Sequence, residues 1–318
     1  MRKVVILTSG FITLSVLFFS CSEKMNPPTM PETTLFTPSF VLMWGGEGDG
    51  DGEFNRPQGI AIDNNDNVYI VDAHNHRIQK FNSDGVFLSK WGSRGGENGQ
   101  FEYPQAAVVD NNDNIYVVDS QNDRIQKFNS EGVFLDKWGS QGSGDGEFSG
   151  AEGIVINGGG NIYVTEAGNH RIQKFNSDGV FLSKWGSGGS GNGQFWWPSG
   201  IAADSGNNVY VADMMNYRIQ KFDLNGVFLN KWGNIGFENG QFDRPMAIAV
   251  DSIGNVYVSD LNNRIQKFDS DGMFLGKWGS WGSGDGEFNV PAGIAIGSND
   301  VVYVVDRGNH RIQKFEYW

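Results

Sequence analysis

The chain has 318 residues, of which 45 are glycine, 9 are proline and 13% are aromatic. So many aromatic residues need a core, which excludes a disordered chain, and the glycine content fits short strands joined by tight turns. The net charge of −13 argues against a nucleic-acid partner, because binding phosphate requires a basic surface. The single cysteine, Cys21, excludes intramolecular disulfides and a thiolate metal cluster.

The N-terminal segment has the pattern of an export signal. Two basic residues precede an apolar run over residues 4–19, which is short for a membrane span of about 20 residues. The end of the run resembles the lipobox of bacterial lipoproteins, whose cysteine, here Cys21, becomes lipidated. We therefore expect a signal at residues 1–20, a proline-containing tether at 21–39, and an exported protein that is lipid-anchored at a membrane surface or secreted. An ordinary cleaved signal with a chance cysteine is the alternative.

One phrase, Arg-Ile-Gln-Lys-Phe, recurs at steps of 46 or 47 residues, which indicates one supersecondary unit copied in tandem. In the first copy we expect four short strands, named a to d: residues 59–63, 68–72, 77–81 and 86–91. Asn-Asp and Asp-Gly sequences between them are typical of tight turns. The six copies of the phrase begin at Arg77, Arg124, Arg171, Arg218, Arg264 and Arg311.

Four strands in a repeat of about 45 residues make a β-propeller blade, so six repeats predict six blades. The last copy ends after strand c, whereas residues 40–45 look like an isolated strand d. The N-terminal strand would therefore complete the last blade and close the ring, which leaves no open sheet edge. A solenoid is the competing repeat architecture, but it does not explain why the N-terminus carries the strand that the last repeat lacks. We predict a monomeric, all-β, six-bladed propeller over residues 40–318, with four antiparallel strands per blade.

The repeat resembles the NHL repeat. The resemblance is carried by Asn-His-Arg-Ile at residues 75–78, 169–172 and 309–312, by the preceding Tyr-Val-x-Asp strand, and by a Pro-x-Gly-Ile-Ala strand. It implies the six-bladed propeller fold, here of a bacterial secreted lipoprotein type. The departures are Asp123, Tyr217 and Asn263 in place of the histidine, Ala151 in place of the proline and Glu166 in place of the aspartate.

The binding surface is expected on one face of the ring. Because strand direction alternates, the b–c loops and the long d–a loops open on the same side, which we call the loop face. Its sequences vary between blades, and loops on a rigid scaffold commonly carry binding sites. We expect a protein, peptide or glycan partner there; the alternative is that the loop-face aromatics pack between blades. The candidate contacts are Tyr103, Trp196, Trp197, Tyr217, Phe237 and Trp281.

A carboxylate ends strand b in every blade, four or five residues before the arginine that starts strand c. We interpret the six pairs as structural, because one copy per blade is typical of a repeated fold element. An acidic ring that holds a cation is the alternative. The pairs are Asp72–Arg77, Asp119–Arg124, Glu166–Arg171, Asp213–Arg218, Asp260–Arg264 and Asp306–Arg311.

An enzyme is the less favoured function. His76, His170 and His310 share one repeat position, and propeller lyases and lactonases of similar shape hold zinc or calcium in the central channel, so a metal-dependent lyase or lactonase is the alternative. Strand a, however, is expected to offer few polar residues to the channel. The acidic glycine stretches near residues 49–53 lack the spacing of a calcium loop. We therefore predict a binding protein without a cofactor, and the sequence leaves catalysis open.

Overall fold

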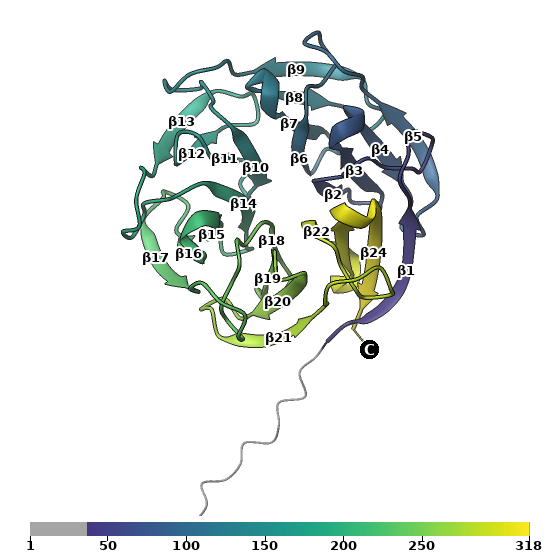
Figure 1. The fold of residues 1–318 in the computed structure, drawn as a ribbon. Coiled ribbons are helices and arrows are strands. Elements are labelled where there is room, and N and C mark those ends of the chain that lie inside the picture. Colours follow the sequence, from purple (N-terminus) through teal and green to yellow (C-terminus); the bar gives the residue numbers. More distant parts are fainter. Residues whose placement is uncertain (1–36, 318) are drawn as a thin grey trace, which may run out of the picture. The chain divides into compact units, whose positions relative to one another are not determined.

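The computed structural model describes residues 37–317, so the expected signal, Cys21 and nearly all of the tether lie outside the described residues. These residues form six four-stranded antiparallel sheets arranged around a central axis (Figure 1). This arrangement confirms the predicted six-bladed β-propeller. Within residues 37–317, no helix has the length and apolar character that crossing a membrane requires.

The blades follow the repeats in order. Blade 1 contains β2 (Ile60–Ile62), β3 (Val68–Asp72), β4 (Arg77–Phe81) and β5 (Phe87–Trp91). Blade 2 contains β6 (Pro104–Val109), β7 (Ile115–Asp119), β8 (Arg124–Phe128) and β9 (Phe134–Trp138). Blade 3 contains β10 (Ala151–Ile156), β11 (Ile162–Glu166), β12 (Arg171–Phe175) and β13 (Phe181–Trp185).

The second half of the ring repeats the pattern. Blade 4 contains β14 (Pro198–Ala203), β15 (Val209–Asp213), β16 (Arg218–Phe222) and β17 (Phe228–Trp232). Blade 5 contains β18 (Ile248–Val250), β19 (Val256–Asp260), β20 (Arg264–Phe268) and β21 (Phe274–Trp278). Blade 6 contains β22 (Pro291–Ile296), β23 (Val302–Asp306), β24 (Arg311–Glu316) and β1 (Ser39–Gly45). Short 3₁₀ turns are η1 (Ala73–Asn75), η2 (Ser120–Asn122), η3 (Met214–Asn216), η4 (Ser298–Asp300) and η5 (Arg307–Asn309).

The N-terminal strand closes the ring as expected. β1 pairs antiparallel with β24, from Ser39 opposite Glu316 to Gly45 opposite Arg311. It is the outermost strand of blade 6, beside the C-terminus (Figure 1). Both ends of the described chain are therefore held in one sheet, and no blade is left with a strand missing.

The hydrophobic core lies between neighbouring blades. All five residues of each strand b are buried, as the β-branched and aromatic composition of these strands requires. At the junction of blades 1 and 2, Trp91 contacts Tyr69 edge-on at 6.1 Å between ring centroids and Phe128 at 5.9 Å. A Cβ at Gly132 would lie 2.6 Å from Trp91 Cδ2, so only glycine leaves room for this indole. The same Trp-on-Gly contact recurs at four other junctions.

Candidate functional site

All six carboxylate–arginine pairs form, with N–O distances of 2.6–3.2 Å. In blade 1, Asp72 has no exposed surface, and its second oxygen accepts the backbone N–H of Asn55 at 2.8 Å. Arg77 also donates to the carbonyls of Gly50 and Glu53, each at 2.8 Å. The pair therefore ties the d–a loop to strands b and c, and its hydrogen-bonding capacity is used within the fold.

The carboxylate–arginine pair in blade 5 has the longest N–O distance of the six pairs. Its repeat is one residue shorter, and Arg264 Nε lies 3.2 Å from the carboxylate of Asp260, against 2.7 Å for the pair in blade 1. Burial raises the pKa of Asp260 to about 6, although Arg264 opposes the shift. Even this pair is buried beneath the loop and is not open to a ligand.

Each repeat histidine joins its blade to the next one. The backbone N–H of Tyr103 donates to Nδ1 of His76 at 3.2 Å, and the N–H of Trp197 donates to Nδ1 of His170 at 3.3 Å. His310 accepts the equivalent bond from blade 1. The three histidines therefore lie at three separate junctions. Residues 37–317 contain no group of three or more His, Cys, Asp or Glu side chains suited to hold a metal ion.

The donors of these bonds share an uncommon backbone conformation. The residue before the proline position of each repeat is left-handed in all six blades, with φ between 46° and 62°. For residues other than glycine this region is sparsely populated, and such residues concentrate at functional sites. Four of the six positions carry a large side chain on the loop face, and the other two are Val290 and Gly150; the four are Arg56, Tyr103, Trp197 and Arg244.

The predicted contact aromatics are on the loop face, but at different junctions. Trp196 and Trp197 are 52% and 45% exposed, and Trp196 stacks on His170 of the preceding blade with centroids 5.5 Å apart. Tyr103 packs edge-on against His76 at 4.7 Å and is only partly exposed, as is Tyr217. Two further aromatics are 75–77% exposed in the d–a loops that follow blades 4 and 5, Phe237 and Trp281.

The acidic glycine stretches form loops that are held by their own side chains. The carboxylate of Glu53 accepts the N–H of Gly50 at 3.0 Å, and Glu147 and Glu287 do the same in their loops. Asp51 forms an exposed ion pair with Lys90 at 2.6 Å. Within the described residues these acids therefore act as local hydrogen-bond acceptors and not as a shared ligand set.

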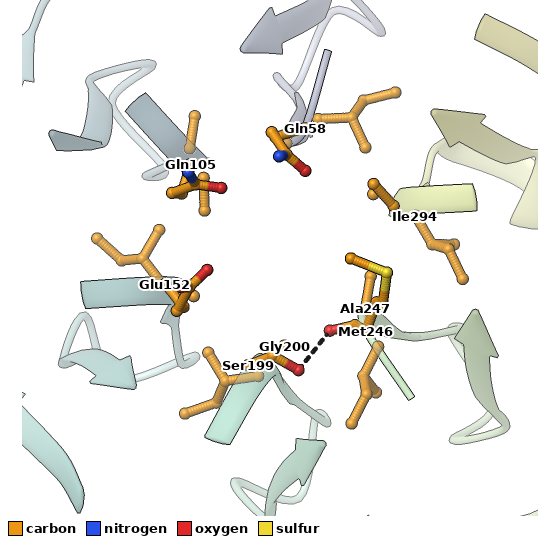
Figure 2. A pocket seen from close by; sticks show the side chains of 18 residues that line it. Gln58, Gln105, Glu152, Ser199, Gly200, Met246, Ala247 and Ile294 are labelled. Atoms are coloured by element: carbon orange, nitrogen blue, oxygen red, sulfur yellow. Dashed lines mark hydrogen bonds between the residues drawn. The ribbon is translucent and has the colours of Figure 1, made fainter. Parts of the chain in front are cut away.

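The central channel contains a polar ring that the sequence interpretation missed. A cavity of about 130 Å³ lies on the axis, and Figure 2 shows side chains from the start of each strand a around it. Four of the six residues that follow the proline position are polar, so the expectation of few polar channel residues was wrong. The sequence signal that could have revealed this ring is the variable residue x in the Pro-x-Gly-Ile motif of strand a. The ring consists of Gln58, Gln105, Glu152, Ser199, Met246 and Ala292.

Glu152 is the titratable member of this ring. Its carboxyl group forms no hydrogen bond or ion pair with any residue from 37 to 317, and it extends into the channel (Figure 2). Burial raises its pKa to about 7, while Arg307 of blade 6 favours the ionised form. A carboxyl group with a pKa near neutrality can exchange a proton at physiological pH and can donate or accept a hydrogen bond.

The NHL repeat family matches residues 54–81, 101–128, 148–175, 195–222 and 288–315. The unmatched copy is that of blade 5, which has the shortened b–c loop.

Among curated proteins, lin-41 of Caenorhabditis elegans is 48% identical over 50 residues, which is 16% of this chain and 4% of that protein. The chain therefore spans only a small part of the length of that relative.

Solved structures share the fold over most of the chain. A Bacteroides thetaiotaomicron protein of unknown function has a TM-score of 0.69 and 18% identity, covering 88% of this chain and 76% of its own. The gluconolactonase XC5397 of Xanthomonas campestris has a TM-score of 0.65 and 13% identity, covering 89% and 97%. Virginiamycin B lyase of Staphylococcus aureus has a TM-score of 0.60 and 16% identity, covering 87% and 99%. At these identities the likeness concerns the fold alone. The chain belongs to the NHL-repeat family and is a six-bladed β-propeller.

Proposed function

We propose that this propeller is a binding protein that recognises a protein, peptide or glycan through its loop face. The observation that carries the proposal is the pair Trp196 and Trp197, about half exposed at the start of blade 4. Tryptophan contributes strongly to binding because it buries a large area at a small cost in side-chain entropy. NHL-repeat propellers generally mediate protein interactions, which is consistent with a protein partner.

The rigidity of the surrounding structure supports this role. Trp197 is held by its N–H bond to His170, and Trp196 is stacked on the same imidazole. The backbone N–H of Trp196 also donates to the buried carboxylate of Asp213 at 2.8 Å. A surface positioned in this way loses little conformational freedom on binding, which improves affinity.

We also propose that the protein is exported and held at a membrane surface through lipid on Cys21. The support is the sequence pattern of residues 1–21, which lies outside the described structure. Cys21→Ser should release the protein from the membrane fraction, because the lipid chains contribute about 0.8 kcal/mol per buried methylene group. Unchanged retention of this variant would contradict the proposal.

The binding role is tested with Trp196→Ala combined with Trp197→Ala. Partners from the native organism would be captured on the immobilised protein, identified, and their dissociation constants then measured. We expect the double variant to weaken binding by roughly a hundredfold, as loss of two anchor residues commonly does, with little change in melting temperature. Val180→Ala with Leu182→Ala is the control, because both side chains are exposed on outer strand β13 or just before it. Equal loss in both double variants would reject the loop face as the binding surface.

The second candidate is an enzyme with its site in the central channel, of lyase or lactonase type. Glu152 favours it, because a pKa of about 7 suits a general acid or base. The described residues lack a clustered metal ligand set, so they do not fit the metal-dependent form of this proposal. Elemental analysis and melting with and without chelator test that form directly. Stoichiometric zinc or calcium, with a lower melting temperature in chelator, would restore it.

A further inference from the structure

A second cavity opens on the loop face where blade 6 meets blade 1. It has a volume of about 280 Å³. Its walls come from both ends of the repeat region: Arg56 precedes the first strand of blade 1, and Arg307 and His310 belong to η5 and the turn that follows it in blade 6. The remaining lining residues are Asn289, Val290 and Gly308.

The two arginines of this cavity lack carboxylate partners. Neither Arg56 nor Arg307 takes part in any of the ion pairs among residues 37–317, although the chain as a whole carries a net charge of −13. With the amide oxygen of Gln58 turned toward it, Arg307 Nε lies 3.2 Å from that neutral acceptor. Burial and the neighbouring Arg56 both lower the pKa of Arg307, and the carboxyl group of Glu152, which forms no ion pair with it, acts in the opposite direction. Two nearby guanidinium groups, one of them half-buried, are unfavourable without an anion.

His310 lies on the wall of the same cavity. Its Nδ1 is within hydrogen-bond distance of two backbone groups, the N–H of Arg56 at 3.3 Å and the carbonyl oxygen of Phe54 at 3.2 Å, so either neutral tautomer of the ring has a partner at Nδ1. The other ring nitrogen, Nε2, has no hydrogen-bond partner among residues 37–317 and is left for a ligand. The same positive charge acts on His74, in the b–c loop of blade 1. Burial is the largest cause that lowers the pKa of His74, and the charges of Arg56 and Arg307 lower it further.

We propose that the cavity between blades 6 and 1 binds an oxyanion group, such as a carboxylate, sulfate or phosphate, carried by the ligand of the loop face. Guanidinium groups bind such groups through paired, charge-assisted hydrogen bonds. The site is particular to this junction. At the junction of blades 4 and 5, Arg244 occupies the position of Arg56, but Met214 and Tyr217 replace Arg307 and His310. The inference rests on the proposed binding of a ligand at the loop face, but the anion site does not depend on the aromatic contact.

The experiment measures the melting temperature of the full-length chain against the concentration of sodium phosphate, sulfate or acetate, at constant ionic strength set with sodium chloride. Binding to the folded state raises the melting temperature with ligand concentration, which yields an apparent dissociation constant. Arg307→Met introduces the residue that blade 4 carries at this position. The side chain of Arg56 is exposed, so Arg56→Gln tests the site even if the first variant fails to fold. Arg244→Gln is the control, since it has the same left-handed backbone and the same change in charge.

We expect at least one of the three anions to bind, and Arg307→Met and Arg56→Gln each to weaken it by roughly tenfold, as loss of a charge-assisted hydrogen bond does. Arg244→Gln should stay within about twofold. The anion that binds with the lowest apparent dissociation constant distinguishes a ligand that carries a carboxylate from one that carries a phosphate or sulfate. Equal weakening in all three variants, or no saturable effect of any anion on the wild type, would overturn the proposal. Trp196→Ala with Trp197→Ala should leave the anion response unchanged, so failure of one proposal does not imply failure of the other.

Discussion

The imidazole of His310 accepts a hydrogen bond from the backbone N–H of Arg56, 254 residues away, and this bond joins the last blade to the first. It is the ring-closing copy of a contact that links consecutive blades elsewhere. The repeat histidine is therefore an inter-blade acceptor. Only the backbone of the partner is needed, which explains why the side chain of that partner varies from arginine to tyrosine and tryptophan.

The first prediction concerns this acceptor. His310→Ala should lower the free energy of unfolding by about 1 kcal/mol or more, because the N–H of Arg56 loses its partner. His310→Asn should retain most of the stability, since Asn263 already serves in blade 5, where its Oδ1 accepts the N–H of Val290 at 2.8 Å. Urea unfolding followed by tryptophan fluorescence measures both. Equal losses in the two variants would contradict the acceptor role.

The second prediction concerns the glycine beneath Trp91. Gly132→Ala should destabilise the protein by about 2 kcal/mol or more, through a strained left-handed backbone and overlap with the indole. Gly99→Ala is the matched control, because both glycines have φ of 79° but nothing lies within 4 Å of a Cβ at Gly99. Thermal unfolding of the two variants isolates the contact with Trp91. Identical melting temperatures would mean that the indole moves aside without cost.

The third prediction separates buried from exposed ion pairs. Asp119→Ala should cost about 3–5 kcal/mol, because it leaves Arg124 buried without its counter-charge. Asp51→Ala removes a carboxylate at a similar distance from its partner, 2.6 Å against 2.7 Å, but that pair is exposed and should contribute less than about 1 kcal/mol. Chemical denaturation measures both free energies. Similar costs would argue against the structural role of the six pairs.

The sequence predicted the fold well because its signals are local and repeated. Strands b and c of blade 1 have the predicted bounds, 68–72 and 77–81, and the missing outer strand of blade 6 was found at the N-terminus. The channel ring was missed for a physical reason. A strand that faces other blades on one side and an axial cavity on the other shows no simple alternation, so Glu152 and Gln105 look like ordinary variable positions.

The electrostatic features depend on contacts between distant blades. Arg307 lies in blade 6, yet its charge acts on Glu152 of blade 3 and on His74 of blade 1. No spacing within one repeat reveals such a relation, because it arises only when the ring closes. The repeat pattern identifies the residues that the blades have in common, whereas the structure shows which blade-specific residues lie close together.

The fourth prediction concerns the pH dependence that Glu152 imposes on stability. Its pKa is about 7 in the folded protein against 4.5 for an unperturbed glutamic acid, so folding favours the protonated form. The contribution of this group to stability is therefore fully present below pH 4.5 and is lost as the pH rises through 7. Glu152→Gln, which copies Gln105 of blade 2, should make the protein more stable than wild type above pH 7 by up to about 3 kcal/mol, with no difference near pH 4. Urea unfolding across this pH range measures it, and Glu97→Gln on the exposed surface controls for net charge. A difference between Glu152→Gln and wild type that does not change with pH would show that the channel water solvates this carboxylate fully.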